Sequence, residues 1–411
     1  MDFRPYNPKD DRPAVLRIWR EVGWSDGSPQ QEKAFDYHIE AGRALLAELG
    51  GTPECVVVTA PAAMRYLEQD LATCIVASVA TSHVGRKRGL AIRLAAQAVA
   101  QAAAEGALVA ALGMFEQGFY DRLGFGTGSY EHWVAFDPAE LKVAVKPRLP
   151  RRLTHEDWEA AHAARLARWR GHGAVSLLPA GITRAGMHAA RNGFGFGYRD
   201  GPGGSLSHCL WGNAENLGRG PYRIWWLAYR TGEQFLELMA LVKSLGDQVR
   251  QVQMVEPPEV QVQDLLHKPF RTRQLSERSP FEAGMRASAW WQARICDLAG
   301  CLQHTHLAGP AVRFNLRLSD PIGRYLGPDA PWRGVAGEWV VTLGPCSAAE
   351  PGVEQGLPTL VATVNAFTRL WLGVVPASGL AITDALSGPQ ELLAALEAAL
   401  RLPRPMPGWM F

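Results

Sequence analysis

The stretch TCIVASVATSHVGRKRGLA, residues 73–91, decides the fold of the first part of the chain. Its first nine residues are mostly apolar or small, which predicts a buried strand, and the alanine-rich run from about Gly89 to Glu105 predicts a helix. Gly106 follows as a natural helix stop, and ALVAALGM then predicts a second buried strand. The sequence therefore predicts strand, basic turn, helix and strand in succession.

The turn RKRGLA, residues 86–91, has the chemistry of an anion site. A helix N-terminus carries unpaired N–H groups and the positive end of the helix dipole, so it binds phosphate. Gly89 allows the backbone to approach an anion closely, and the three basic side chains before it add charge. The pattern R-x-x-G-x-A also fits an ordinary solvated basic turn, which stays the alternative at this point.

Outward from this stretch, the chain divides into three segments with predicted bounds 1–145, 146–289 and 290–411. We expect SYEHWVAF to be the last strand of the first segment. In the second segment RLARWRGHGA echoes the earlier LRIWREVGW, and the helix QFLELMALVKSLG lies between the strands YRIWWLAY and RQVQMVE. This arrangement predicts a diverged duplication. The third segment starts near WWQARICDLAG and alternates strands with helices.

Composition and charge exclude several classes of function. A formal charge of +2 gives no basic field for nucleic acid or for an anionic membrane. No run of about 18 apolar residues exists, and the opening MDFRPYNPKDD lacks the apolar core of a signal peptide, so we expect a cytoplasmic protein. Six scattered cysteines are then expected to be reduced thiols.

Two local patterns could be mistaken for ligand sites. Cys296, Cys301, His304 and His306 lie within eleven residues, but their spacing is not that of a zinc ribbon, so we expect ordinary packing and no metal. The glycine run GFGFGYRDGPGGS precedes strand-like residues rather than a helix. It therefore predicts a hairpin rather than a nucleotide loop.

Taken together, these motifs resemble the GNAT (Gcn5-related N-acetyltransferase) superfamily. VATSHVGRKRGLA looks like its acetyl-CoA-binding segment, and GFYDRLGFG, about thirty residues on, looks like its tyrosine-plus-glycine turn. His83 stands where the family often has proline. The whole chain also resembles the enhanced intracellular survival (Eis) acetyltransferases, through EQGFYDRLGFG, RWRGHGAVSLLP, WWQARICDLAGCL and the final Phe411.

The resemblance implies an α+β fold. It consists of tandem GNAT-like domains with mixed central sheets, the second without the basic turn, followed by a sterol-carrier-protein-like α+β domain. It also implies transfer of an acetyl group from acetyl-CoA directly to an amine, with backbone N–H groups near Val79 polarising the thioester carbonyl. The cofactor-binding residues that it implies are Val79, Ala80, Thr81, Arg86, Lys87, Arg88, Gly89 and Ala91.

Two further residues acquire catalytic roles through the resemblance. Tyr120 matches the general acid that protonates the departing thiolate, although without the family context a core aromatic is the simpler reading. The apolar ending MPGWMF matches a tail that enters the active site, where the carboxylate of Phe411 is the base. The alternative for the tail is that it only packs against the pocket.

The acceptor and the partners are less defined by the sequence. Trp24 and Asp26 fall on a loop that borders the amine pocket in this family, although Asp26 before a glycine is also an ordinary turn residue. The resemblance implies that an aminoglycoside, a polycation, would be held by acidic side chains, and Met410 beside the terminus is neutral. The expected acceptor is therefore another small-molecule amine or a lysine side chain rather than an aminoglycoside. The resemblance implies a homohexamer. The competing hypothesis is a non-catalytic acyl-CoA-binding, lipid-binding or scaffold protein.

Overall fold

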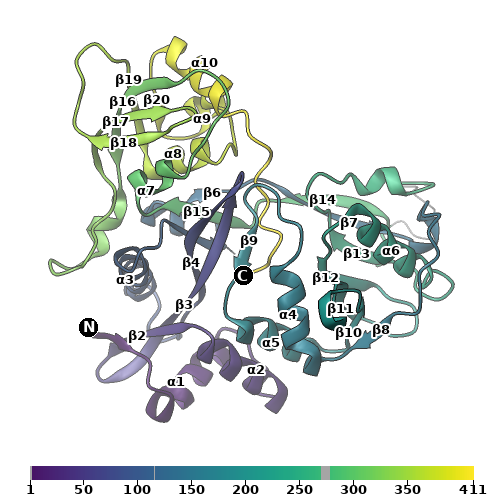
Figure 1. Ribbon diagram of the computed structural model, residues 1–411. Coiled ribbons are helices and arrows are strands. Elements are labelled where there is room, and N and C mark those ends of the chain that lie inside the picture. Colours follow the sequence, from purple (N-terminus) through teal and green to yellow (C-terminus); the bar gives the residue numbers. More distant parts are fainter. Residues whose placement is uncertain (1, 115, 270–277) are drawn as a thin grey trace.

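The computed structural model of the chain describes residues 2–114, 116–269 and 278–411. Over these residues the strands form three sheets of eight, seven and five strands, with helices packed around them (Figure 1). Each sheet is mixed, because each contains a parallel pair among antiparallel ones. The predicted α+β fold with several mixed sheets is therefore confirmed.

The first sheet contains residues 73–91, the strand, basic turn and helix start. Its strands, in spatial order with β9 attached beside β3, are β1 (Asp2–Pro5), β2 (Arg43–Leu49), β3 (Thr52–Tyr66), β4 (Gln69–Thr81), β5 (Val109–Gly113), β15 (Trp291–Ile295), β6 (Gly126–Thr127) and β9 (Val175–Leu177). Helix α3 (Leu90–Ala104) connects β4 to its parallel neighbour β5 and packs on one face. Helices α1 (Pro8–Glu21) and α2 (Pro29–Glu40) cover the other face.

The second sheet repeats this plan. Its strands, in spatial order, are β14 (Gly284–Ser288), β7 (Glu131–Phe136), β13 (Val252–Val255), β12 (Tyr222–Ala228), β11 (His208–Ala214), β10 (Gly193–Tyr198) and β8 (Arg151–Leu153). Helix α6 (Gly232–Lys243) connects β12 to its parallel neighbour β13, as α3 connects β4 to β5. The glycine run forms the antiparallel pair β10–β11, so the hairpin prediction is confirmed.

The duplication extends to a detail of the strand pairing. The antiparallel pair β3–β4 shifts register between Val56 and Val58, and the pair β11–β12 shifts register between Trp211 and Gly212. In both sheets the irregularity lies on the strand that enters the crossover helix. Two copies of the same bulged β-α-β plan therefore stand in one chain.

The third sheet packs with its own helices. Its strands, in spatial order, are β18 (Ala348–Pro351), β17 (Gly337–Leu343), β16 (Val312–Ser319), β19 (Thr359–Thr363) and β20 (Leu386–Ser387). The helices of this part are α7 (Leu298–Gln303), α8 (Val364–Trp371), α9 (Ala377–Thr383) and α10 (Gln390–Ala399). One hydrophobic core joins this sheet to the first, since Tyr66 stacks on Trp371 with ring centroids 4.6 Å apart.

Strands cross the predicted segment bounds. The expected last strand of the first segment, SYEHWVAF, is β7, and it pairs with β13 and β14 in the second sheet. Conversely, β15 from the start of the third segment inserts between β5 and β6 of the first sheet. SYEHWVAF is a strand, as expected, but it belongs to the second sheet, because a strand's sheet is fixed by pairing partners that lie far away in sequence. The segment bounds themselves stay a prediction.

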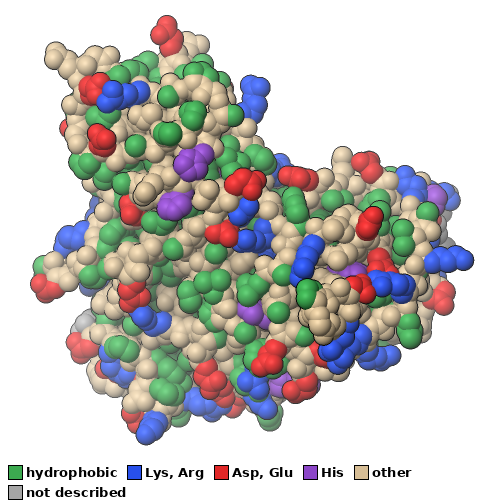
Figure 2. All heavy atoms as spheres, viewed as in Figure 1, with side chains coloured by type: hydrophobic (Ala, Val, Ile, Leu, Met, Phe, Trp, Pro, Cys, Tyr) green, Lys and Arg blue, Asp and Glu red, His purple; other side chains and the backbone are tan. Residues whose placement is uncertain are grey.

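Charges are interleaved on the face shown in Figure 2, where acidic and basic side chains lie next to one another rather than in fields of one sign. Within residues 2–114, 116–269 and 278–411, no helix combines the length and the apolarity that crossing a membrane requires.

Candidate active site

A cleft opens in the first sheet where two parallel strands separate. Strand β5 pairs with β4 only over residues 73–76, whereas β4 continues to Thr81. Past that point lies a cleft of about 900 Å³. Its lining includes Val22, Trp24, Val79, Ala80, Thr81, Gly85, Arg86, Lys87, Gly89, Leu90, Ala91, Ile92, Glu116, Phe119, Tyr120 and Arg122. Most of the predicted cofactor residues therefore meet at one place.

The N-terminus of α3 faces this cleft with its amides uncapped. The N-cap residue is Gly89, which has a left-handed φ of +73° and makes no side-chain cap hydrogen bond. A Cβ at Gly89 would meet nothing within 4 Å, so a side chain would have room there. Glycine is favoured at this position because other residues rarely adopt a left-handed φ. Since the first N–H groups of a helix need partners, this end is suited to an anion.

The basic side chains of the turn divide into two groups. Arg86 and Lys87 line the cleft, where they can meet a phosphate. Arg88 instead donates from Nε to the carbonyl of Val84 at 3.2 Å and does not line the cleft.

Tyr120 lines the same cleft as the turn. It begins the 3₁₀ turn η1 (Tyr120–Leu123), is 3% exposed, and packs edge-to-face against Phe119 and Phe125. Burial raises the pKa of the Tyr120 hydroxyl above its ordinary value of 10. The hydroxyl therefore keeps its proton at neutral pH and is available as a donor.

The tail that ends in Phe411 is held by hydrogen bonds along its length. Ser129 Oγ donates to the carbonyl of Pro405, the Met406 N–H donates to the backbone carbonyl of His172, and the Val175 N–H donates to the carbonyl of Pro407. Trp409 is 2% exposed, with the guanidinium of Arg165 3.5 Å from its ring centroid. The apolar tail is thus a docked segment of the fold.

The last residue of the tail lies against β5. Glycine at position 113, the end of β5, leaves space that an oxygen of the terminal carboxylate of Phe411 and the ring of Trp290 occupy. The rings of Trp290 and Phe411 lie 5.3 Å apart. Phe411 does not line the cleft described above, although it borders the strand at which that cleft opens.

The two predicted acceptor residues lie apart. Trp24 is 44% exposed and lines the cleft. Asp26 does not line it; its Oδ1 accepts the Ser28 N–H at 2.8 Å in the turn before α2. The hydrogen bonds from Ser28 hold the pKa of the Asp26 carboxyl below its usual value. The contacts of Asp26 are those of a turn residue.

Several cleft residues escaped the sequence analysis. Glu116, Phe119 and Arg122 lie close to Tyr120 in sequence, and a longer tyrosine motif could have included them. Arg122 donates to the Tyr325 hydroxyl at 3.1 Å and so ties the cleft to the third part of the chain. His38 on α2 does not line the cleft but lies behind it, against Ser78 of β4, and a single histidine on an amphipathic helix gives no sequence signal for such a place.

The corresponding place in the second sheet is largely filled. Strands β12 and β13 separate after the pair Ile224–Met254, and a cavity of about 80 Å³ remains there. Tail residues from Met406 to Met410 form part of its wall, together with Glu131. Burial raises the pKa of Glu131 to about 7, and its carboxylate accepts hydrogen bonds from Trp290 Nε1 and the Gly408 N–H. The tail therefore lies in the second cleft on its way to the first.

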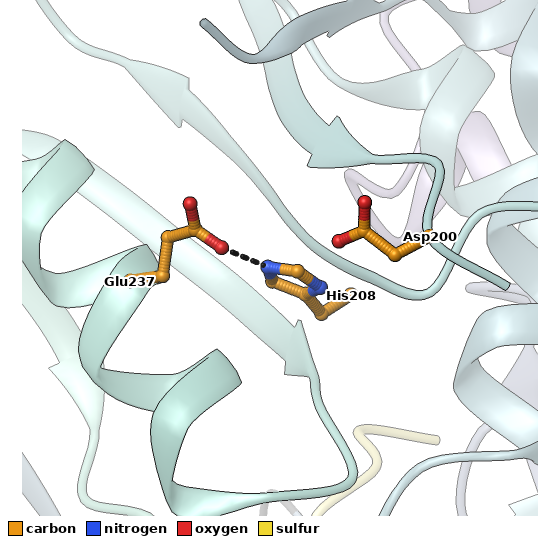
Figure 3. A group of neighbouring side chains, drawn as sticks. All are labelled: Asp200, His208 and Glu237. Atoms are coloured by element: carbon orange, nitrogen blue, oxygen red, sulfur yellow. Dashed lines mark hydrogen bonds and ion pairs between the residues drawn. The ribbon is translucent and has the colours of Figure 1, made fainter. Parts of the chain in front are cut away.

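One group of side chains has the spacing of metal ligands. Asp200, His208 and Glu237 converge, with candidate ligand atoms within 4.8 Å of one another (Figure 3). Arg148, however, donates to both carboxylates, at 2.7 Å to Glu237 Oε2 and 2.7 Å to Asp200 Oδ2. A guanidinium already occupies the place that a cation would take, so the group is an ion-pair network.

The cysteine–histidine cluster does not converge. Cys296 and Cys301 are buried, and the Cys301 thiol donates to the carbonyl of Leu108. The rings of His304 and His306 bond to the carbonyls of Gly300 and Pro345. These side chains are directed at separate backbone groups.

Comparisons with known proteins bear on the fold of the whole chain and on the family of its first domain. Residues 2–128 match the family model described as an acetyltransferase (GNAT) domain. No curated protein matches the sequence. Similar solved structures include a conserved protein of unknown function from Enterococcus faecalis (16% identical, TM-score 0.80, covering 100% of this chain and 99% of that one). A GCN5-related N-acetyltransferase from Anabaena variabilis has 14% identity and a TM-score of 0.79, with full coverage of both chains. Eis1 from Mycobacterium abscessus has 15% identity and a TM-score of 0.75, again with full coverage.

Proposed function

We propose that this chain, which carries a GNAT acetyltransferase domain over residues 2–128, is an Eis-like N-acetyltransferase that moves an acetyl group from acetyl-CoA to a primary amine. The observation that carries the proposal is the cleft between β4 and β5, which brings an uncapped helix N-terminus and a buried tyrosine to one place. A thioester with a phosphate-bearing tail fits both ends of this cleft.

Binding of acetyl-CoA would use the backbone as much as the side chains. The pantetheine arm would lie along Val79, Ala80 and Thr81, where β4 has left its partner β5. The pyrophosphate would lie on the turn from Arg86 to Ala91, with the N–H groups of α3 as donors. Arg88 bonds to its own turn, so we assign the charge contribution to Arg86 and Lys87.

In the transfer itself the amine nitrogen attacks the thioester carbonyl carbon, and the carbonyl oxygen gains negative charge. N–H groups near Val79 stabilise that charge. The C–S bond then breaks, and the Tyr120 hydroxyl gives its proton to the departing thiolate. The terminal carboxylate of Phe411 takes the proton of the amine, through water. Its position beside Gly113 supports this assignment.

Other features of the proposal rest on the resemblance to Eis proteins. They are the three domains 1–145, 146–289 and 290–411, the sterol-carrier-like character of the last, a homohexamer and a cytoplasmic location. The acceptor is a small-molecule amine or a lysine side chain, in a pocket that Trp24 borders and to which Asp26 adds charge.

A calorimetric titration of acetyl-CoA into the untagged protein tests the proposal without knowledge of the amine. We expect micromolar binding that is lost in the double variant Arg86→Ala, Gly89→Asp, since this variant removes one charge and places another at the helix N-terminus. The matched control is Arg88→Ala, whose side chain bonds to Val84 outside the cleft. If the unmodified protein fails to bind acetyl-CoA, the turn is only a basic loop and the proposal is wrong.

A further inference from the structure

Strand β4 contains a residue in an unusual conformation beside the cleft. Ser78 has a φ of +50°, in the left-handed region. It lies in the register shift of β3–β4, where Val56 pairs with Ala80 and Val58 pairs with Ala77. Two residues of β4, Ser78 and Val79, therefore oppose one residue of β3. Non-glycine residues enter the left-handed region at a cost, so a contact must hold Ser78 there.

That contact comes from helix α2. His38 Nε2 lies 2.9 Å from Ser78 Oγ, at hydrogen-bond distance. The His38 ring packs near the Trp19 ring, with centroids 6.1 Å apart. Burial lowers the pKa of His38 to about 4, so the ring is neutral at physiological pH and adds no charge beside the cleft. A neutral ring fixed by α1 and α2 is a suitable anchor for a strained backbone.

The second sheet supplies an internal comparison. Its register shift between Trp211 and Gly212 places Trp225 as the extra residue on β12, and Trp225 does not have a positive φ. A bulge at this place in the fold thus does not by itself require a left-handed residue. The left-handed conformation belongs to the copy that has the open cleft and the uncapped helix.

We infer that His38 is a positioning residue for acetyl transfer, holding Ser78 left-handed so that the Val79 N–H faces the thioester carbonyl. A bulge leaves one residue of the wider strand out of the ladder, and pairing with β5 has already ended at Val76. The amide freed in this way is that of Val79, which lies in the register shift and lines the cleft. The inference rests on the proposed function and assigns how its oxyanion donor is oriented.

The expected effect falls on turnover rather than on binding. The N–H group gains most as negative charge develops on the carbonyl oxygen, so misplacing it slows the chemical step. We expect His38→Leu to lower kcat by about tenfold, which corresponds to roughly 1.4 kcal/mol of barrier. The KM for acetyl-CoA should change less than about threefold, because the helix N-terminus and Arg86 are untouched.

Glycine at position 78 provides the decisive control. Glycine adopts a φ of +50° without a holding contact, so Ser78→Gly should be faster than Ser78→Ala, in which nothing holds the left-handed residue. In the Ser78→Gly background, His38→Leu should lose its effect. His38→Gln, whose amide can reach Ser78 in place of Nε2, should retain turnover. If His38→Leu is equally slow on both backgrounds, or slow on neither, the inference is wrong.

A spectroscopic readout separates this inference from the proposed function. The carbonyl ¹³C signal of bound [1-¹³C]acetyl-CoA reports polarisation of the thioester without any amine. We expect the signal to move toward its free position in Ser78→Ala and to stay at the bound position in Ser78→Gly. Equal signals in both variants overturn the role of the bulge even if turnover is normal. Failure of the unmodified protein to bind acetyl-CoA overturns the proposed function instead. Should His38→Leu not fold, the Ser78 pair alone decides.

Discussion

Two hypotheses for Tyr120, a general acid and a core aromatic, differ only in whether the hydroxyl group is needed. Both readings need a buried aromatic ring, and the structure provides one at 3% exposure. Only the catalytic reading needs the O–H group. The raised pKa of Tyr120 matters here because an acid must still hold its proton when the thiolate departs.

Replacing Tyr120 by Phe keeps the ring and removes the proton donor. We expect kcat to fall by about 100-fold, in the range of general acid catalysis, with acetyl-CoA affinity unchanged by calorimetry. The matched control is Phe119→Leu, which alters the neighbouring ring and leaves the hydroxyl in place. Undiminished turnover in Tyr120→Phe would remove this residue from the mechanism.

Glu131 predicts a pH dependence of stability. Burial raises its pKa to about 7 in the folded protein, above the value of 4.5 in the unfolded chain, so the folded state holds the proton more strongly. The free energy of unfolding should therefore fall as pH rises from about 4.5 to about 7 and then level off. The loss for this group is roughly 3 kcal/mol.

The difference in unfolding free energy between the unmodified protein and Glu131→Gln isolates this contribution. Glutamine keeps an acceptor for Trp290 and Gly408 and does not titrate. We expect Glu131→Gln to gain relative stability between pH 4.5 and 7, measured by urea denaturation at each pH. A pH-independent difference would contradict the burial of a protonated carboxyl.

The site residues that the sequence could predict lie in short motifs, so their immediate neighbours in the chain are enough to identify them. Gly89 and its basic neighbours are contiguous, and the signal for Tyr120 lies in one short motif. His38 and Glu131 were missed because what matters about them is their environment. The bulge at Ser78 and the tail at Gly408 come from distant parts of the chain.

At the scale of elements, the tail after Pro405 runs from the second cleft to strand β5 of the first sheet. It passes through the second cleft where β12 and β13 separate. Trp409 holds it in place against two guanidinium groups, that of the buried Arg165 and that of the partly buried Arg168. The second copy of the duplicated unit therefore holds the C-terminal tail, and the tail ends against the first copy.

A short Gly-Ser extension after Phe411 should depress turnover by at least about tenfold, since it converts the carboxylate into a neutral peptide group beside Gly113. Acetyl-CoA affinity should persist, because the cleft lining does not include Phe411. The same extension placed before Asp2 is the control. Equal turnover for both extended proteins would show that the carboxylate is not the base.

The elements differed in how well the sequence predicted them. The helix predicted from Gly89 to Glu105 is α3, Leu90–Ala104, because alanine content and a glycine at each end are local signals. The strand SYEHWVAF was found, but its sheet was not. Alternation of apolar residues indicates a strand and says nothing about its neighbour, so β7 and β15 could be placed only by the structure.

For the molecule as a whole, a buried ion pair joins the first sheet to the third part of the chain. Arg294 on β15 binds Asp320 at 2.6 Å, and both side chains are fully buried. Asp320 also caps η6 (Pro321–Tyr325) by accepting the Ile322 N–H. The pair lies close to Gly124, so it links the tyrosine motif to the core that the two sheets share.

Asp320→Asn should destabilise the protein by about 3–5 kcal/mol, because it leaves the Arg294 charge buried without its partner. The matched control is Glu354→Gln, which breaks the exposed pair Arg313–Glu354 and should cost less than about 1 kcal/mol. Thermal unfolding by calorimetry measures both. A change in Asp320→Asn as small as in the control would mean that the two parts are not coupled through this pair.

The insertion of β15 between β5 and β6 has a consequence for how the chain is made. A ribosome delivers β5 long before β15, so the growing first sheet must wait with an open edge while the whole second sheet is synthesised. Open edges invite pairing with other chains. The first sheet can therefore be completed only late in translation, and nascent chains of this protein should depend on chaperones during that interval.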